Sequence, residues 1–110
     1  MPYIATNERR KLDPLIDKLA KQITKQAKAR KYDGAFAGLL NYACTRLALK
    51  VARLQFGKMR YWLIALLVGV FKNIADEFYR RIGIPYEDNQ IKKSGDVDLY
   101  KKYSEEIDKM

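Results

Sequence analysis

The sequence predicts an all-α fold, a small helical bundle of three main helices plus a short C-terminal helix, assembled into an oligomer. Apolar residues recur at the three- and four-residue spacing of amphipathic helices along most of the 110 residues. Glycine and proline interrupt this pattern at only a few places, which sets the expected helix ends. One segment is apolar nearly all round and has more surface than three helices can cover, which predicts self-association.

The first helix is predicted to begin at Asp13 and Pro14. An aspartate accepts hydrogen bonds from the free amides of a helix start, and proline suits the first helical position. Apolar residues then recur at helical spacing with lysines between them. They are Leu15, Ile16, Leu19, Ile23 and Ala27, with Lys18, Lys21, Lys25 and Lys28. Residues 31–34 are predicted to form a turn.

The second helix is predicted over residues 35–55, with a core face, a face of small residues and a polar strip between them. The core face holds Phe36, Leu39, Leu40, Ala43, Leu47, Val51 and Leu54. The small face holds Gly38, Asn41, Thr45, Ala48 and Ala52. The strip holds Tyr42, Arg46, Lys50 and Arg53. We expect this helix to be packed on both faces.

The third helix is predicted over residues 58–82, with Gly83 and Pro85 ending it. Its first half is the segment that is apolar nearly all round. Its second half places each of two acids four residues before an arginine, a favourable order for ion pairs. The two expected pairs are Asp76 with Arg80 and Glu77 with Arg81.

Residues 85–97 are predicted to form a polar loop with a turn at Gly95, after which Asp98 caps a short helix. That helix presents Leu99, Tyr103 and Ile107 on one side. We therefore expect residues 1–110 to form a single helical domain, in which 1–84 are a basic helical body and 85–110 are the polar loop and short C-terminal helix.

The net charge of +9 is unevenly distributed along the chain. Residues 1–84 have 17 Lys and Arg against 6 acids, whereas residues 85–110 have 5 against 7. A basic body of this kind attracts phosphate-bearing partners, and the acidic tail has the charge to fold back over it.

The composition excludes several classes of chemistry. Histidine is absent and Cys44 is the only cysteine, which argues against zinc sites and histidine-based catalysis. We expect Cys44 to serve packing, and we expect a protein that is not an enzyme and needs no cofactor. The start of the chain does not resemble a secretory signal. The longest apolar stretch, residues 61–71, is about half of the ~20 residues that span a membrane. A cytoplasmic location without a membrane partner is the expectation.

The strongest candidate site combines arginines with tyrosines. Guanidinium groups grip phosphate oxygens in a planar fork, and tyrosine rings stack on bases. The candidate ligand-binding residues are Asn41, Tyr42, Thr45, Arg46, Tyr79, Arg80, Arg81 and Tyr86. The alternative is structural: Arg80 and Arg81 pair with the preceding acids, and Asn41 and Thr45 serve a helix contact.

Carboxylates are the ligands that Mg²⁺ prefers, and four of them lie near the end of the chain: Glu87, Asp88, Asp96 and Asp98. Acid pairs of this kind are common in solvated loops, so we predict no metal site. The segment from Glu8 to Lys11 is most simply a solvated basic stretch, with nucleic-acid contact as the alternative.

Several segments together are similar to a family of short uncharacterised proteins encoded by tailed phages and prophages. The segments are Leu40–Leu47 (LNYACTRL), Glu77–Arg81 (EFYRR), Pro85–Asp88 (PYED) and Gly95–Val97 (GDV). The resemblance runs from the opening Met1-Pro2-Tyr3-Ile4 to about Val97. It departs at Cys44, at Phe71-Lys72 and in the helix after Val97, and it brings no established activity. Some small basic phage homo-oligomers trap nucleotide signals of bacterial defence between subunits, and this chain is similar to them in size and charge.

These observations favour a non-enzymatic homo-oligomer that sequesters a phosphate-containing ligand, such as a cyclic dinucleotide, in a basic pocket between subunits in the host cytoplasm. One alternative is a nucleic-acid-binding accessory protein. Against it, we expect the lysines of the first helix to be spread around that helix. The other alternative is a structural or partner-binding phage protein whose third helix docks on another polypeptide.

Overall fold

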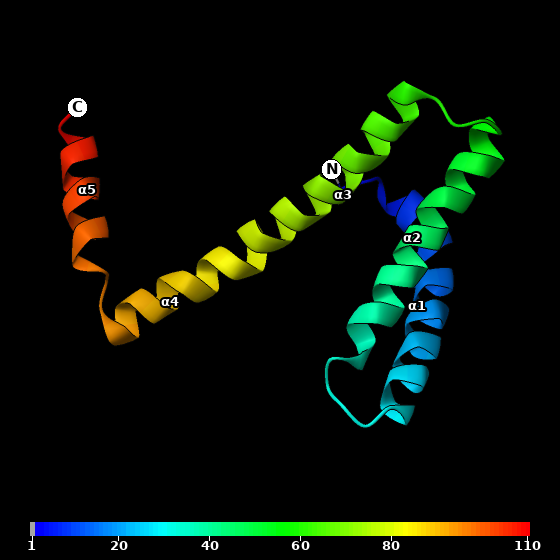
Figure 1. Ribbon diagram of the computed structural model, residues 1–110, viewed down its shortest axis with the longest axis horizontal. Helices are drawn as coiled ribbons and strands as arrows, with labels where there is room; N and C mark the ends of the chain where they lie inside the picture. The colour runs from blue at the N-terminus through cyan, green and yellow to red at the C-terminus, as the bar shows by residue number, and fades with distance from the viewer. Residues whose placement is uncertain (1) are drawn as a thin grey trace. The chain divides into compact units, whose positions relative to one another are not determined.

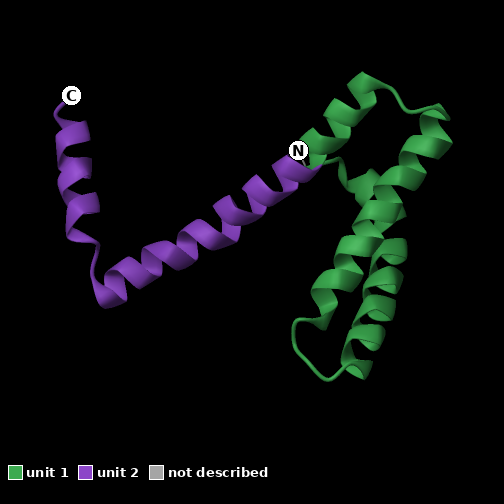
Figure 2. Ribbon diagram, in the orientation of Figure 1, with its two compact units in different colours: residues 1–70 green, residues 71–110 purple. Residues whose placement is uncertain are grey.

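The computed structural model describes residues 2–110, and all regular structure in that range is helical (Figure 1). The chain divides into two compact units, residues 1–70 and 71–110, with the boundary inside the third helix (Figure 2). The elements, in chain order, are α1 (Thr6–Ala29), α2 (Ala35–Phe56), α3 (Tyr61–Phe78), the π-helix η1 (Tyr79–Gly83), α4 (Ile84–Ser94) and α5 (Asp98–Asp108). The all-α prediction is confirmed for the described residues.

Helix α1 begins earlier than the sequence indicated. It starts at Thr6, and Pro14 lies inside it instead of opening it. The added turns have an acid, Glu8, near the positive end of the helix, and the Arg9 side chain donates from Nε to the Ile4 carbonyl oxygen at 2.7 Å. The residues before Pro14 are mostly good helix formers, so they extend the helix past a proline that removes one internal hydrogen bond.

Helix α2 has the predicted start and ends one residue beyond the predicted end, and the turn before it is also confirmed. Its predicted core face is only partly covered. Leu39 and Ala43 are half-buried, whereas Phe36 and Leu54 are 54% and 75% exposed. The buried residues of α2 are Ala35, at its start, and Ala52, from the predicted small face near its end. The uneven burial arises because α1 covers only part of this face within unit 1.

Helix α3 is anchored to the end of α2 by an aromatic contact and an apolar one. The rings of Phe56 and Trp62 meet edge to face with centroids 5.0 Å apart. Leu63 is 4% exposed and lines the same small hollow as Ala52. Together with Ala35, these are the buried apolar residues of the described chain, and all three belong to unit 1.

The prediction that Gly83 and Pro85 stop the third helix is wrong. Gly83 has helical angles, φ −65° and ψ −49°, and Pro85 occupies the first turn of α4. The Ile84 N–H reaches back five residues to the Tyr79 carbonyl oxygen, which makes this junction a π-turn. A proline in a helix's first turn removes an N–H that needs no partner there, so the chain remains helical.

The predicted polar loop at residues 85–97 is therefore also wrong over most of its length, because α4 occupies it. Gly95, at φ 85°, ends α4, which confirms the turn at that residue. Helix α5 follows as predicted, although the capping position is Val97 and not Asp98. Leu99, Tyr103 and Ile107 of α5 are 58%, 59% and 65% exposed.

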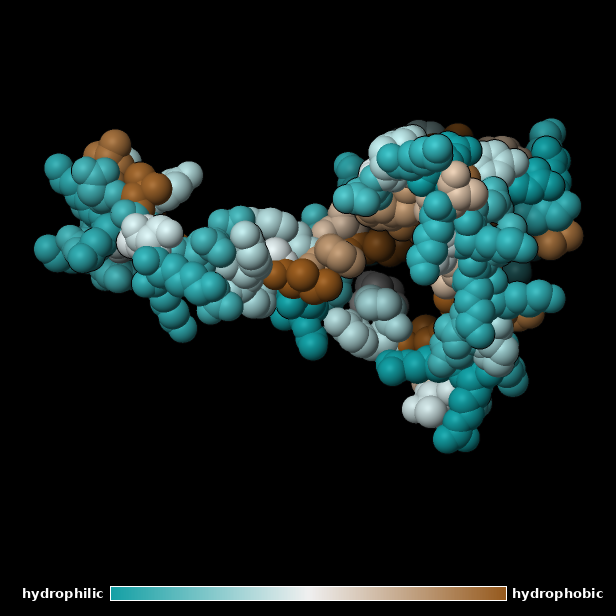
Figure 3. Space-filling model, turned by 90° about the horizontal axis from the view of Figure 1, so that it is seen from below, coloured by the Kyte–Doolittle hydropathy of each residue, from teal (hydrophilic) through white to brown (hydrophobic). Residues whose placement is uncertain are grey.

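Large apolar side chains are exposed on every one of the α-helices, and Figure 3 shows several of them at the surface. None of the described helices is both long enough and apolar enough to cross a membrane.

Candidate functional site

The polar strip of α2 forms one wall of an open groove. Its lining side chains recur every three or four residues, so they lie on one side of the helix. The groove has a volume of about 300 Å³ and is lined by Tyr42, Thr45, Arg46, Leu49, Lys50 and Arg53. We call it the α2 groove. Because these residues all come from α2, unit 1 builds the groove from a single element.

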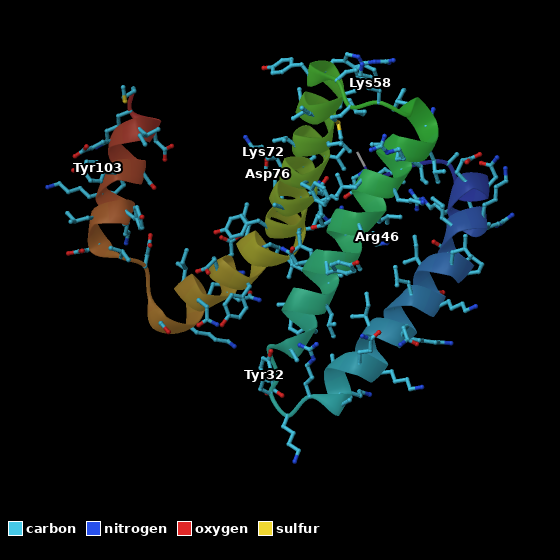
Figure 4. The ribbon with its side chains drawn as sticks, turned by 45° about the vertical axis from the view of Figure 1, so that its right-hand side comes forward. Tyr32, Arg46, Lys58, Lys72, Asp76 and Tyr103 are labelled. Atoms are coloured by element: carbon cyan, nitrogen blue, oxygen red, sulfur yellow. The ribbon has the colours of Figure 1, made fainter. Side chains whose placement is uncertain are left out.

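Two of the three cations in the α2 groove are available to a ligand. Arg46 and Lys50 are exposed, lie one turn apart and form no ion pair within the described residues. Figure 4 shows Arg46 on α2. Arg53 is committed elsewhere, because its Nη1 donates to the carbonyl oxygen of Gly57 at 2.6 Å. Gly57 has φ 74°, in the left-handed region that favours glycine, and its N–H donates to the Arg53 carbonyl oxygen. Arg53 therefore closes the end of α2, leaving Arg46 and Lys50 for an anion.

The predicted pair Asn41 and Thr45 is used locally. The Thr45 hydroxyl donates to the Asn41 backbone carbonyl oxygen at 2.7 Å and also lies 3.5 Å from Asn41 Oδ1. This back-bond occupies the only donor of the hydroxyl and leaves its oxygen able to accept a hydrogen bond. Thr45 lines the α2 groove, whereas Asn41 is not among its lining residues.

A second hollow, between α1 and α2, borders the same strip. It is about 400 Å³ in volume and mainly apolar at its centre, where Leu19 and Ile23 of α1 face Leu39, Ala43 and Leu47 of α2. Gln22, Gln26, Tyr42, Arg46 and Lys50 complete its lining. Tyr42, Arg46 and Lys50 of the strip thus line both hollows.

The other predicted site residues belong to unit 2. Arg80 donates from Nε to Glu77 Oε1 at 2.5 Å, three residues apart, instead of forming the predicted pair with Asp76. Arg81, predicted to pair with Glu77, has no ion pair among the described residues. The partner of Arg80 is thus one residue later than predicted, because a helix brings residues three apart together as well as residues four apart.

The two tyrosines of this set lie in different elements. Tyr79 opens η1, and its ring occupies the space into which a Cβ on Gly83 would project, so glycine is required there for this ring position. Tyr86 lies in the first turn of α4 and is 60% exposed. The structure thus gathers Tyr42, Thr45 and Arg46 in the α2 groove, and Tyr79, Arg80, Arg81 and Tyr86 along the η1–α4 segment of unit 2. The candidate site is the α2 groove.

Two of the four carboxylates near the end of the chain accept local hydrogen bonds. Asp96 Oδ1 accepts from the Val97 N–H at 2.7 Å, and Asp98 Oδ1 accepts from the Leu99 N–H at 2.9 Å. Across residues 2–110, no group of three or more Cys, Asp or Glu side chains is arranged to hold a metal ion.

Cys44 corrects another expectation. It is exposed rather than packed at the edge of the core face, for the same reason that the rest of that face is open.

A family model for a domain of unknown function, DUF6899, matches residues 1–97. The chain belongs to this family. The matched range includes α1 to α4 and ends just before α5. No curated protein and no solved structure matches the chain.

The groove contains one feature that sequence reasoning missed. Leu49 lines the α2 groove, although it belongs to neither predicted face of α2. Its position three residues after Arg46 and four after Thr45 is the signal that would have identified it.

Proposed function

We propose that this DUF6899 protein binds a phosphate-containing small molecule in the α2 groove, as a homo-oligomer and without converting the ligand. The observation that carries the proposal is the pair Arg46 and Lys50, which line one open groove and form no ion pair within the described residues. Like charges one turn apart destabilise a helix by about 0.2–0.5 kcal/mol. A bound phosphate relieves this repulsion and accepts charge-assisted hydrogen bonds.

The remaining lining residues suit a nucleotide. Tyr42 is 65% exposed and offers a ring face for a base, Leu49 adds apolar surface, and the Thr45 oxygen is free to accept. At about 300 Å³ the groove is at the lower end of the range for small-molecule sites. A cyclic dinucleotide needs a larger and more enclosed site, which a second wall from another copy would supply.

The exposed apolar surface of unit 1 supports self-association. Apart from Ala35 and Ala52, its one buried apolar residue is Leu63. Along the same helix, Leu66 is 60% exposed and Val70 is 51% exposed. Folded domains gain their few kcal/mol of net stability mainly from apolar burial, and surfaces of this kind mark association sites. Copies of the chain packed through these faces would provide the missing burial.

A binding function without turnover fits the available side chains. The chain has no histidine, and the described residues hold no metal-binding cluster, so two common ways of activating water or a nucleophile are missing. The resemblance to short phage proteins supports a role in an infected bacterial cell. There, sequestration of a nucleotide signal of host defence, such as a cyclic dinucleotide, is the function that we propose.

The proposal is tested by thermal-shift and calorimetric titration of the protein with cyclic dinucleotides, linear mononucleotides and inorganic phosphate. A ligand at 100 times its Kd stabilises the folded state by about 2.7 kcal/mol, which raises Tm by several degrees. Chromatography of the ligand after incubation should return it unchanged. If no member of the panel raises Tm, or if the recovered ligand is converted, the proposal fails.

A further inference from the structure

Five cations of α1 lie along one side of the helix. On a helix of about 3.6 residues per turn, they fall within roughly 80° of the circumference. They are Arg10, Lys18, Lys21, Lys25 and Lys28, and all are exposed. We call this strip the α1 ridge. The expectation of lysines spread around this helix is therefore corrected.

The α1 ridge lies on the side of α1 opposite its apolar face, and it is open. Leu19, on the apolar face, lines the hollow shared with α2. Lys11 borders one edge of the ridge and pairs with Glu8 at 3.7 Å. Asp13 and Asp17 border the other edge. None of the five ridge cations forms an ion pair within residues 2–110.

The spacing of the ridge suits a repeating anion. Lys18, Lys21, Lys25 and Lys28 follow one another at three or four residues, about 4.5–6 Å apart along the helix axis. A small ligand would neutralise one or two of these charges. A phosphodiester chain carries a charge at every nucleotide and neutralises several at once, releasing the counterions that had condensed on it.

The ridge leads to a hollow at the turn between α1 and α2. It has a volume of about 360 Å³, and Lys28, Arg30 and Lys31 line it together with the aromatic residues Tyr32 and Phe36. Thr24, Ala27 and Asp33 complete the lining. Figure 4 shows Tyr32 at this turn, where it is 63% exposed, and Phe36 is 54% exposed. Exposed rings among cations are the features with which proteins bind unpaired bases.

We propose that the α1 ridge and this hollow bind single-stranded nucleic acid, with the ridge on the phosphates and Tyr32 stacked on a base. The rings favour a single strand over a duplex, whose bases are already stacked on each other. This second activity is independent of the proposed small-ligand site, because Arg46 and Lys50 of the α2 groove are not part of the ridge or the hollow.

The test is a fluorescence titration of the full chain with labelled oligo(dT) at two salt concentrations. Neutralising four phosphates of a single strand gives a log–log salt slope of about −2.8, so affinity should fall roughly 50-fold between 50 and 200 mM salt. The double variant Lys21→Gln/Lys25→Gln should bind more weakly, and the fall should shrink to roughly 7-fold. Tyr32→Ala should weaken binding about 5- to 150-fold by loss of stacking.

The matched control is Lys101→Gln/Lys102→Gln in α5, which removes the same charge from exposed positions outside the ridge. It should leave the affinity and the salt slope unchanged. Equal losses in both double variants would overturn the proposal, since attraction would then follow net charge alone. No binding of oligo(dT) at low salt would also overturn it. Tighter binding to duplex DNA than to oligo(dT) would overturn it too. The same holds if the ridge binds phosphatidylserine vesicles instead of oligo(dT). Arg46→Ala should not change oligo(dT) binding, so this proposal and the proposed function can fail separately.

Discussion

Arg46→Ala is expected to weaken binding of the phosphate-containing ligand without unfolding the protein. The substitution removes one charge-assisted hydrogen bond, worth about 1.5–3 kcal/mol, so Kd should rise roughly 10- to 150-fold. The guanidinium is exposed and forms no ion pair in the described part of the chain, so its loss strands no buried partner. The free energy of unfolding should therefore change by less than about 0.5 kcal/mol. It should move upward, because repulsion with Lys50 is relieved.

The assay pairs calorimetric titration with urea denaturation, each carried out on wild type, Arg46→Ala and Arg60→Ala. Arg60 is exposed and lies between α2 and α3, outside the α2 groove, so its variant controls for the loss of one arginine. Wild-type affinity in Arg46→Ala together with reduced stability would refute the reasoning, since Arg46 would then act through packing of its aliphatic stem.

Three further outcomes follow from the same structure. Arg53→Ala should lower the free energy of unfolding by about 0.5–1.5 kcal/mol in urea denaturation, because the carbonyl oxygen of Gly57 loses its donor; an unchanged midpoint would contradict this capping role. Gly83→Ala should lower Tm, since its Cβ would overlap the Tyr79 ring, and adding Tyr79→Ala should recover part of the loss; additive effects in the double variant would exclude that contact. Leu63→Ala should cost about 2–5 kcal/mol in urea denaturation, as for other buried leucines, and a cost below 1 kcal/mol would show that the site is not packed.

The helix bounds that the sequence predicted correctly depend on residues close to them in the chain. The bounds of α2 follow from a turn before it and a glycine after it, and Gly95 marks a turn because its φ is positive. The two predictions that rested on proline, a helix start at Pro14 and a helix end at Pro85, were wrong. Proline can also lie inside a helix or in the first turn of a helix that follows another. Pro14 lies within a helix whose earlier residues extend it, and Pro85 lies in the first turn of a helix that continues through a π-turn.

Burial and the site could be predicted only in part. The strip of Tyr42, Arg46 and Lys50 follows from helical period alone, and the structure keeps these residues on one groove. Phe36 and Cys44 are exposed because no other element covers them. Which elements cover α2 depends on tertiary packing, which the period of the sequence does not reveal. The lysines of the α1 ridge lie within the helix predicted from Asp13, so helical period alone could have aligned them, whereas Arg10 joins the ridge only because α1 begins at Thr6.

Backbone NMR shifts recorded during titration with a cyclic dinucleotide test the central claim most directly. The binding site is expected on α2, so the largest shift changes should fall on residues 42–53, and Arg46→Ala should abolish them at the same ligand concentration. Shift changes confined to α1 or to residues 71–110, with residues 42–53 unaffected, would contradict the account.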